Sequence, residues 1–399
     1  MLAQECKTMD EVQNRLRDMF KGAVEQMLEA EMDNHLGYEK HSTAGDNTGN
    51  SRNGYSHKTI QTKNGRSEIA IPRDRKASFE PQIVRKHQST VNDIEEKIIA
   101  MYAKGLSTRD IEDHVMDIYG IEVSPSLVSR ITDKITPEIA EWQARPLESM
   151  YPVVFLDAIH FRVRRDSRVV SKAAYTVLGI NLLGRKNILG IWIGESESAS
   201  FWLGVCNDLR SRGVKDILVV AKDGLSGFSD AVRTVFPHTD MQMCVIHQLR
   251  SCMKYVPWKE RKQVVRQLKT VYQASTLDEA ELRFEEFKRD WGKPYGLVVK
   301  AWERNWAEVT TFFSYPPEIR KLIYTTNPVE IYHRQLRKIT KNKTTYPNDE
   351  ALTKILYLGT LAISEKWTQP VQNWAITLAQ LVIYFGDRVT DHMEVGLSL

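Results

Sequence analysis

The sequence predicts an α/β protein in which a helical N-terminal region is followed by a domain with a mixed sheet. Two observations carry this prediction. Between residues 153 and 246, apolar runs of strand length alternate with segments of helical spacing, as in sheets with crossover helices. Between residues 92 and 135, apolar residues instead recur every three or four positions. The 399 residues suffice for two or three domains, and 42% hydrophobic with 27% charged residues is ordinary for a globular protein.

Composition also excludes several classes of protein. No stretch approaches the roughly 20 apolar residues of a membrane span, since the most apolar run, residues 374–385, is interrupted by Thr377 and Gln380. The N-terminus, MLAQECKTMD, lacks the pattern of a signal peptide. Four cysteines in so long a chain do not form a disulfide framework. We therefore expect a cytoplasmic protein that does not associate with a membrane.

The first 40 residues predict a helical region, and their charge differs from that of the adjoining segment. Apolar residues recur at helical spacing from Val12 to Leu28, which favours one long helix packed on a neighbouring element or a partner subunit. Residues 1–40 hold five basic and nine acidic side chains, whereas residues 51–90 hold nine basic and three acidic ones. The change of sign marks a boundary between two parts of the chain.

Residues 41–90 predict a polar linker and a basic β-hairpin. The first part of this segment is rich in Gly, Asn and Ser and is too polar to pack. Two short strands, residues 59–62 and 68–71, then flank Asn64 and Gly65, a strong signal for a tight hairpin turn. The hairpin is either a solvated surface element or a wing whose lysines and arginines contact phosphates.

Residues 91–146 predict a DNA-binding domain with a helix-turn-helix. A capping box that begins at Ser107 opens one helix, whose expected inward residues include Ile118. Ser124 and Pro125 start the next helix as N-cap and first helical residue. Because the connection YGIEV is longer than a minimal turn, a plain helical bundle is the alternative. In a helix-turn-helix, the outward side chains of the second helix would enter a major groove: Ser126, Ser129, Arg130 and Lys134.

Residues 147–257 predict the first part of an α/β domain. The elements follow the order β-β-β-α-β-α-β, which is the order of RNase H-like domains. A strand that follows a crossover helix belongs to a parallel pair. The expected elements are strands 153–161, 173–182 and 187–193, helix 198–212, strand 217–221, helix 228–236 and strand 241–246.

A long helical segment, residues 258–322, interrupts this fold, and residues 323–399 complete the domain. The inserted segment is rich in tryptophan and phenylalanine. Such aromatic side chains mostly belong to a core. The alternative for one of the tryptophans is a stacking contact with a DNA end.

Two aspartates occupy places in this pattern that require an explanation. Asp157 lies within an apolar strand, where an ionised carboxylate is costly unless it is paired or binds a metal. A salt bridge to an adjacent arginine (Arg162, Arg164 or Arg165) is the structural explanation. Asp223 directly follows a buried strand, at the carboxyl end that faces the ligand crevice in parallel sheets, although Asp-Gly is also a common turn.

A third acidic residue, Glu330, lies near the start of a basic helix. Asn327 and Pro328 fit the N-cap and the first helical position, and a carboxylate at Glu330 would stabilise that helix start. Glu330 also shares a helix face with basic residues, as expected of a metal site beside a DNA backbone. The basic residues expected to bind DNA on this helix are Arg334, Arg337, Lys338 and Lys341.

Several blocks of the sequence, taken in order, carry a family resemblance. The N-terminal half contains GNSRNGYSHKT, IPRDRKASFEP, AKGLSTRDIEDH and VSPSLVSRITDKI. The C-terminal half contains VVFLDAIHFRVR, AKDGLSGF, CVIHQLR and NPVEIYHRQLRKITKNKTTYPNDEA. These blocks resemble the successive signature blocks of the bacterial Mutator-like insertion-sequence transposases, and the resemblance covers nearly the whole chain.

The resemblance implies an RNase H-like catalytic domain with an inserted helical domain and a DDE triad, which falls on Asp157, Asp223 and Glu330. It implies that these carboxylates hold two divalent ions per active site, Mg²⁺ or Mn²⁺, for phosphodiester chemistry. The expected enzyme binds terminal inverted repeats, cleaves double-stranded DNA at the element ends and joins the 3′ ends to target DNA. Because two ends must be held together, we expect a homodimer or higher homo-oligomer, associated with the bacterial nucleoid.

Two other functions remain as alternatives. A non-catalytic DNA-binding regulator derived from a transposase would keep residues 92–135 and lack metal-dependent activity. A different RNase H-like nuclease, such as a junction resolvase, would cleave DNA without strand transfer.

Two histidines and a cysteine near the acids need their own interpretation. By the resemblance, Cys244 and His247 match the family's Cys/Asp-x-x-His signature, and His247 is expected behind the metal ligands or at the DNA end. A zinc site that includes Cys244 is the alternative, but the spacing lacks two clean ligand pairs. His160 lies an odd number of strand positions from Asp157, which predicts the opposite face of the sheet and a structural role.

The chain departs from the family pattern after the glutamate. Many members read Ser-x-Asn-Arg there, whereas this chain reads Ile331, Tyr332, His333 and Arg334. An ionisable ring thus replaces a neutral amide. We expect His333 to face DNA or Glu330 rather than to bind metal, since two-metal sites of phosphoryl transfer favour oxygen ligands.

Overall fold

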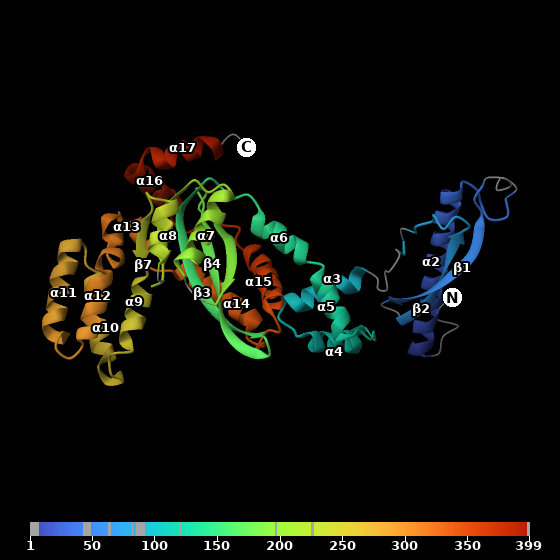
Figure 1. Cartoon of the computed structure of the whole chain (residues 1–399), viewed down its shortest axis with the longest axis horizontal. Coiled ribbons are helices and arrows are strands. Elements are labelled where there is room, and N and C mark those ends of the chain that lie inside the picture. The colour runs from blue at the N-terminus through green and yellow to red at the C-terminus, as the bar shows by residue number, and fades with distance from the viewer. Residues whose placement is uncertain are drawn as a thin grey trace. The chain divides into compact units, whose positions relative to one another are not determined.

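The computed structural model describes residues 8–42, 49–62, 65–81, 83–84, 92–119, 121–195, 198–224 and 227–396. The chain forms two compact units, Met1–Lys134 and Ile135–Leu399, and Figure 1 labels their elements. A membrane-crossing helix, with the length and apolar character that it needs, is not found among the described residues.

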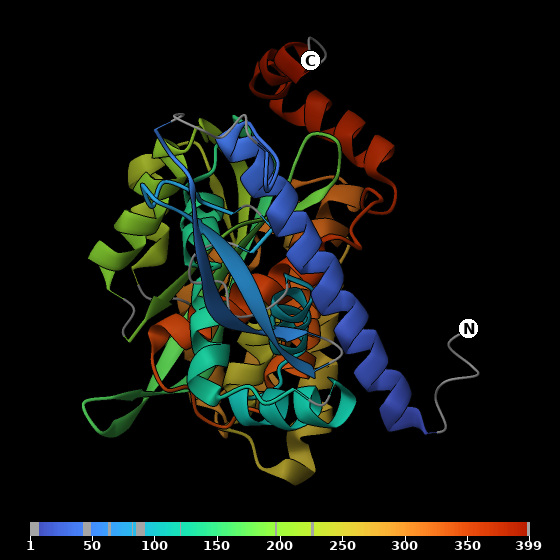
Figure 2. The same ribbon diagram turned by 90° about the vertical axis from the view of Figure 1, so that its right-hand side faces the viewer.

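In the first unit, a long helix lies along a two-stranded sheet (Figure 2). The helix is α2 (Met9–Leu36), and the strands β1 (Arg52–Thr62) and β2 (Gly65–Asp74) pair antiparallel, which confirms the predicted hairpin. The neighbour of the predicted N-terminal helix is therefore a hairpin of the same chain. The predicted turn residue Asn64 lies outside the described residues. The apolar contact involves Phe20, Val24, Leu28, Ile60, Ile69, Ile71, Ile83 and Val84.

Three short helices complete the first unit: α3 (Asn92–Ala103), α4 (Thr108–Tyr119) and α5 (Pro125–Asp133), each in contact with the other two. The predicted starts of two helices are confirmed. Ser107 and Asp110 bond each other's backbone amides in a capping box, and Ser124 Oγ accepts from the amide of Leu127 at 3.2 Å. One side of α5 is buried, and the opposite side is exposed to solvent. The exposed side includes Ser126, Ser129, Arg130 and Lys134, as predicted.

One residue of α4 does not lie where the sequence predicts. Ile118 was expected to face inward, but 64% of its surface is exposed. Ile111 and Val115 of the same helix are buried. Ile118 lies in the last turn of α4, beyond these two residues, and is left uncovered although it lies on the same side of the helix.

The second unit is built on a five-stranded mixed sheet in the order β5-β4-β3-β6-β7. The first three strands in sequence pair antiparallel. β6 then pairs parallel with β3, and β7 pairs parallel with β6, as predicted for strands that follow crossover helices. The predicted chain order β-β-β-α-β-α-β is present. Its elements are β3 (Met150–Arg165), β4 (Arg168–Ile180), β5 (Lys186–Gly194), α7 (Ala199–Ser211), β6 (Asp216–Lys222), α8 (Phe228–Val235) and β7 (Asp240–Met243).

Helices cover both faces of the sheet. On one face, α7 and α8 bury Trp202 and Phe228 against Leu156 and Tyr175 of the strands. On the other face, α14 (Asn327–Thr340) contacts β3 and β4, and α15 (Asp349–Ser364) contacts β5. Three further helices belong to this unit: α6 (Thr136–Ala144), α16 (Trp374–Phe385) and α17 (Asp387–Gly396).

Every element of the predicted inserted segment that the structure describes is a helix. It follows α9 (Val245–Met253) and contains α10 (Trp258–Tyr272), α11 (Leu277–Trp291), α12 (Gly296–Val309), the 3-10 helix η2 (Thr311–Ser314) and α13 (Pro317–Ile323). The side-chain amide of Gln242 on β7 donates through Nε2 to Val309 O at 3.0 Å and so joins the insertion to the sheet edge. Trp302 is fully buried, whereas Trp258 is 83% exposed.

The strand predicted over residues 241–246 is shorter than expected. It ends at Met243, and α9 begins at Val245 with Cys244 as the N-cap residue. A run of apolar residues does not distinguish a buried strand from the first turn of a buried helix. As a result, His247 lies in the first turn of a helix rather than at a strand end.

Candidate active site

The register of two parallel strands places two aspartates side by side. Leu156 of β3 pairs with Lys222, the last residue of β6, so Asp157 and Asp223 are the next residues on neighbouring strands. The side chain of Asp157 is 14% exposed and that of Asp223 is 41% exposed. Because β6 ends here, β3 has no described partner on this side between Leu156 and Val163, where it forms a bridge with Tyr346. The two carboxylates therefore lie at the edge of an opening in the sheet.

Asp157 is held by a hydrogen bond on each oxygen. Oδ1 accepts from the amide of Ala158 at 2.8 Å, and Oδ2 lies 3.1 Å from His333 Nδ1. Burial alone would raise the pKa of this carboxyl, but the hydrogen bond to His333 and the charge of the imidazole hold it below its usual value. Arg165, an expected salt-bridge partner, pairs instead with Glu195 at 2.5 Å. The buried carboxylate is thus stabilised by a histidine from another element.

The sequence predicted that His333 faces DNA or Glu330, but the structure places its ring against Asp157. It is buried, with 1% of its side chain exposed, between α14 and the sheet. Its Nε2 lies 3.1 Å from Oγ1 of Thr176 on β4. A ring that carries a proton on Nδ1 donates to Asp157, and its Nε2 bonds the hydroxyl of Thr176, which can either donate or accept. His333 follows Tyr332 on the buried side of α14. Its place beside this apolar residue in the sequence could have indicated that the ring points inward.

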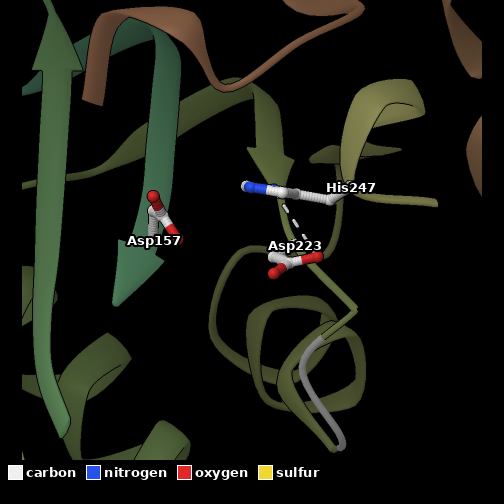
Figure 3. A group of neighbouring side chains, drawn as sticks. All are labelled: Asp157, Asp223 and His247. Atoms are coloured by element: carbon white, nitrogen blue, oxygen red, sulfur yellow. Dashed lines mark ion pairs between the residues drawn. The ribbon is translucent and has the colours of Figure 1, made fainter. Parts of the chain in front are cut away.

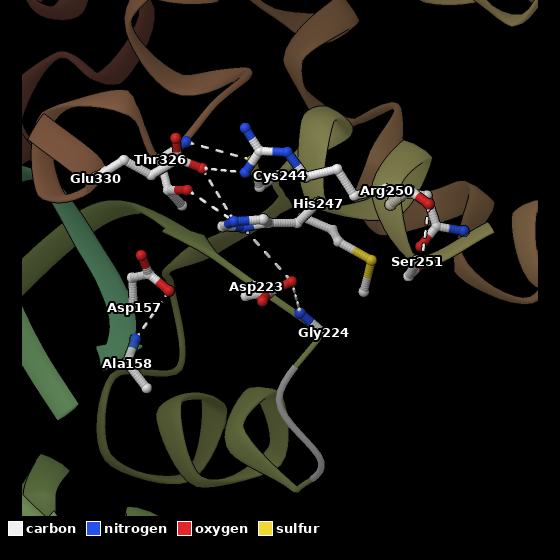
Figure 4. Close-up of polar contacts among 12 residues, drawn as sticks. Asp157, Ala158, Asp223, Gly224, Cys244, His247, Arg250, Ser251, Thr326 and Glu330 are labelled. Atoms are coloured by element: carbon white, nitrogen blue, oxygen red, sulfur yellow. Dashed lines mark hydrogen bonds and ion pairs between the residues drawn. The ribbon is translucent and has the colours of Figure 1, made fainter. Parts of the chain in front are cut away.

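Glu330 reaches the same site from the first turn of α14. Asn327 was expected as the N-cap, but the N-cap residue is Thr326, whose side chain makes no capping bond, so Glu330 occupies the fourth helical position. The hydroxyl of Thr326 lies instead 3.4 Å from His247 Nδ1. Glu330 Oε1 lies 2.9 Å from His247 Nε2 and 3.0 Å from an Arg250 guanidinium nitrogen (Figure 4). The carboxylate therefore bonds to neighbouring side chains instead of capping its helix.

His247 lies beside Asp157 and Asp223 (Figure 3) and contacts Glu330 (Figure 4). Its Nδ1 is 3.6 Å from Asp223 Oδ1. Burial would lower the pKa of the imidazole, but its hydrogen bond with Cys244 and the charge of Asp223 raise the pKa to about 9. The ring is therefore a cation at neutral pH, which balances part of the negative charge of the carboxylates.

One group of side chains could hold a metal ion within the described part of the chain. One ligand atom each from Asp157, Asp223 and His247 lie within 4.8 Å of one another. Glu330 is not in that group, and its Oε1 pairs with His247 and Arg250. No cysteine belongs to this described group, and Cys252 is buried near Gln248. The alternative of a zinc site at Cys244 is therefore not supported by the side chains around it.

An open pocket of about 710 Å³ joins these groups and has a basic wall. Arg250 was not predicted as a site residue. Because residues 241–246 were predicted as a strand, the sequence did not indicate that Arg250 follows His247 by one helical turn. His160 also lines the pocket, although its register places it on the opposite face from Asp157, since the uncovered edge of β3 exposes both faces. Lys338 and Lys341 are exposed on α14 but do not line the pocket. The lining includes Asp157, Asp223, His247, Arg250, Glu330, His333, Arg334 and Arg337.

Comparison with known proteins identifies the family. Residues 1–370 match the family model described as "Transposase, Mutator family". The chain belongs to the Mutator family of transposases. This confirms the resemblance indicated by the signature blocks.

Two relatives of this Mutator-family chain are similar over almost its full length. The "Probable transposase for insertion sequence element ISRM3-like" of Sinorhizobium fredii (strain NBRC 101917 / NGR234) is 41% identical over 374 residues, which cover 94% of this chain and 93% of the relative. The "Transposase for insertion sequence element ISRM3" of Rhizobium meliloti (strain 1021) is 39% identical over the same shares. Among solved structures, the "Drosophila P element transposase strand transfer complex" aligns over 69% of this chain and 92% of that chain, with a TM-score of 0.35 and 9% identity.

Proposed function

We propose that this chain is a DDE transposase of an insertion sequence, which cleaves DNA at the ends of its element and joins the 3′ ends to target DNA. The observation that carries the proposal is one pocket in which Asp157 of β3 and Asp223, directly after the adjacent parallel strand β6, meet Glu330 from α14. The sheet order β5-β4-β3-β6-β7, with the helical insertion before α14, supports an RNase H-like catalytic domain.

The donor set of the pocket suits Mg²⁺ or Mn²⁺. Carboxylate oxygens are the ligands that these hard cations prefer, and the low pKa of Asp157 keeps one of them ionised. Asp157 and Asp223 would hold two ions, and Glu330 would complete one coordination shell. The bound ions would supply an activated water or 3′ hydroxyl and would stabilise the leaving oxygen of the phosphodiester.

The surrounding side chains have separate tasks in this proposal. His333 orients the Asp157 carboxylate, while His247 and Arg250 hold Glu330 until metal and DNA bind. Arg334 and Arg337 line the pocket on the side of α14 and would bind phosphate oxygens. Each of these contacts orients a carboxylate or a phosphate, and none requires a covalent intermediate with the enzyme.

The first unit is proposed to recognise the inverted repeats. The exposed side chains on and after α5, from Ser126 to Lys134, would enter the major groove in a helix-turn-helix arrangement. The hairpin of β1 and β2 carries basic residues that would contact phosphates. Two element ends have to be joined in one complex, so the active assembly is proposed to be a homodimer or larger.

A strand-transfer assay tests the proposal. Labelled inverted-repeat DNA is incubated with the full chain and Mg²⁺ or Mn²⁺, and the wild type is compared with Asp157→Ala, Asp223→Ala and Glu330→Ala. We expect the three variants to lose cleavage and joining by at least about a thousandfold, as when a catalytic group is removed. Asp230→Ala is the matched control, because Asp230 is 86% exposed on α8 and does not line the pocket.

Each alternative function predicts a different result. Activity that survives all three substitutions would exclude the assigned site. Repeat binding by the wild type without any cleaved or joined product would favour a DNA-binding regulator. Metal-dependent cleavage without joined product would favour a nuclease such as a resolvase.

A further inference from the structure

β3 and β4 continue beyond the five-stranded sheet as a two-stranded ribbon. Their pairing runs on to Arg165 and Arg168, whereas β5 pairs with β4 only as far as Ala173 and β6 pairs with β3 only as far as Leu156. Figure 2 shows the end of this ribbon as a narrow green hairpin that projects from the second unit. We call residues 160–173 the β3–β4 ribbon. This part of β3 lies beyond the strands that flank it in the sheet.

The segment after α14 holds the ribbon in place along one edge. Tyr346 N donates to Arg162 O at 2.8 Å, and Arg164 N donates to Tyr346 O at 2.9 Å. The buried ring of Tyr346 packs edge-on against Phe161, with 5.8 Å between the ring centroids. The backbone of the ribbon is thus fixed, and so is the side to which each of its residues points.

One face of the ribbon carries a row of basic side chains. Successive residues of a strand point to opposite faces, so His160, Arg162 and Arg164 share one face. All three are exposed. The residues of β4 that pair with the two arginines are Ser171 and Val169, which are uncharged and exposed as well. This face of the ribbon is therefore cationic on β3 and holds no acidic residue on β4.

The charges of the two arginines are not neutralised by carboxylates of the described chain. Arg165, on the opposite face of the ribbon, forms an ion pair with Glu195 at 2.5 Å. For Arg162 and Arg164, no ion pair with a carboxylate is found in the described part of the chain. An arginine stays charged at neutral pH and binds phosphate oxygens through two parallel hydrogen bonds. We call Arg162 and Arg164 the arginine stripe, and its chemistry suits a phosphate backbone.

The arginine stripe leads away from the acidic pocket. His160, on the same face of the ribbon, lines that pocket together with Asp157. At roughly 3.3 Å per residue, Arg164 lies about 13 Å from His160 along the strand. The spacing of Arg162 and Arg164 is roughly 6.6 Å, which is close to two steps of about 3.4 Å along one strand of B-DNA. A DNA backbone that follows the stripe therefore arrives at the carboxylates.

Two basic surfaces flank the pocket from opposite faces of β3. Arg334 and Arg337 of α14 line the pocket. α14 covers the face of the sheet to which Asp157 points, since His333 of this helix contacts that carboxylate. The arginine stripe lies on the other face by its register. Joining of DNA requires that two DNA molecules, the cleaved element end and the target, reach the same carboxylates.

We propose that the arginine stripe binds the phosphate backbone of target DNA, while the α14 side of the pocket receives the element end. The inference rests on the proposed transposase function and assigns to it a surface for the second DNA molecule. Contacts between arginine and phosphate carry no sequence information, which suits a DNA partner that is not an inverted repeat. Recognition of the repeats is assigned to the first unit and does not require the stripe.

Separate measurements of cleavage and joining test the inference. The double variant Arg162→Gln, Arg164→Gln is expected to cleave the element ends like the wild type. It should join pre-cleaved ends to a labelled plasmid at least about tenfold more slowly, because two charge-assisted contacts are lost. Arg165→Gln is the matched control on the opposite face of the same ribbon and should keep both steps. Circular dichroism verifies that the variants are folded.

Three results of this assay would overturn the proposal. The first is unchanged joining in the double variant. The second is an equal loss of cleavage and joining, which would assign the stripe to element DNA. The third is an equal loss of joining in Arg165→Gln, which would mean that any change in the ribbon impairs the enzyme.

DNA binding without catalysis separates this inference from the proposed chemistry. The full chain is saturated with unlabelled repeat DNA in the absence of metal, and a labelled random duplex is then titrated at several salt concentrations by fluorescence anisotropy. The double variant is expected to lower the slope of log affinity against log salt concentration by about 1.8. Asp157→Ala is expected to bind the random duplex as well, so a failure of catalysis leaves this result intact. A saturated wild type that binds no second duplex, or an unchanged slope, would exclude the stripe as a target-binding surface.

A covalent tether locates the second duplex on the ribbon. Val169 is 54% exposed and pairs with Arg164, whereas Cys206, Cys244 and Cys252 are buried. With repeat DNA and a random duplex both present, Val169→Cys is expected to form a disulfide with a thiol placed on the backbone of the random duplex. The same thiol on the repeat should react far less, and the wild type gives the background. Preferential capture of the repeat would contradict the assignment of the two DNA molecules to the two faces.

Discussion

Asp157 forms a hydrogen bond with a histidine that is almost completely buried. His333 is 1% exposed and joins Asp157 to Thr176 of the neighbouring strand. Its replacement by alanine leaves a cavity and removes one hydrogen bond from each of two buried groups. We expect His333→Ala to destabilise the fold by about 2–4 kcal/mol and to lower strand transfer at least tenfold. Thermal unfolding and the strand-transfer assay measure the two effects separately.

The Mg²⁺ dependence distinguishes orientation of Asp157 from mere structural support. If His333 orients the carboxylate, His333→Ala raises the Mg²⁺ concentration for half-maximal activity, and high Mg²⁺ restores part of the rate. His333→Asn is the informative comparison, since an amide can still donate to Asp157 but is too short to reach Thr176 as well. We expect its Mg²⁺ dependence to lie between those of the wild type and alanine variants. An unchanged Mg²⁺ dependence in His333→Ala would show that the histidine only fills space.

His247 gives the metal-free protein a pH dependence. The pKa of this imidazole is raised from 6.5 to about 9 in the folded chain. A group whose pKa is raised by folding stabilises the fold fully below its unfolded pKa, and this contribution is lost as pH rises through the folded pKa. The stability difference between wild type and His247→Gln should therefore be largest below pH 6.5 and shrink toward pH 9. At about 1.4 kcal/mol per pKa unit, the change is a few kcal/mol at most.

Denaturant titrations at several pH values, with a chelator present, measure this difference. Taking the difference between the two proteins cancels every titrating group that does not interact with His247. A difference that grows from pH 6.5 to 9 would contradict the assignment of a raised pKa.

At the scale of elements, the strands that carry the two aspartates were predictable, because β-branched apolar runs separated by a helical pattern define them. Parallel pairing then follows from the crossover helix, and it sets Asp223, directly after the end of β6, beside Asp157 in the middle of β3. The start of α9 was not predictable, since Val245 and Ile246 suit a strand as well as a buried helix. That ambiguity concealed Arg250, one helical turn beyond His247.

The N-cap of α14 shows a second limit of the sequence. Asn327 followed by Pro328 has the pattern of an N-cap, but the helix begins one residue earlier because Thr326 is buried beside Cys244 and His247. Tertiary contacts thus decided a position that local preference alone assigned to Asn327. The contact of His333 with Asp157 is likewise tertiary, and no local pattern contains it.

The basic side of α14 predicts how DNA binding responds to salt. Arg334 and Arg337 line the pocket, and each phosphate contact contributes about −0.9 to the slope of log affinity against log salt concentration. We expect Arg334→Ala and Arg337→Ala each to reduce that slope by about one, with similar losses for specific and unrelated DNA. Arg210→Ala, an exposed arginine on α7, is the control and should leave the slope unchanged. Fluorescence anisotropy from 50 to 300 mM salt measures these slopes, and equal slopes in all proteins would exclude α14 as a phosphate-binding helix.

At the scale of the whole molecule, two compact units divide the chain at Lys134 and Ile135. The proposed site lies entirely in the second unit, and the proposed groove-binding side chains lie entirely in the first. Substitutions in different units with no shared contacts should act independently. This separation predicts that repeat recognition and metal binding can be lost one at a time.

Two variants of the full chain test this independence. Mg²⁺ at ten times its dissociation constant stabilises the wild type by about 1.4 kcal/mol, which raises Tm by about 3 °C for a unit of this size. Arg130→Ala should weaken binding to inverted-repeat DNA about tenfold and keep this Tm shift, because Arg130 is exposed on α5. Asp223→Ala should show the reverse, repeat binding without a Tm shift. Loss of both properties in either variant would mean that the two units act as one, and recognition would then have to be coupled to the acidic site through a contact between them.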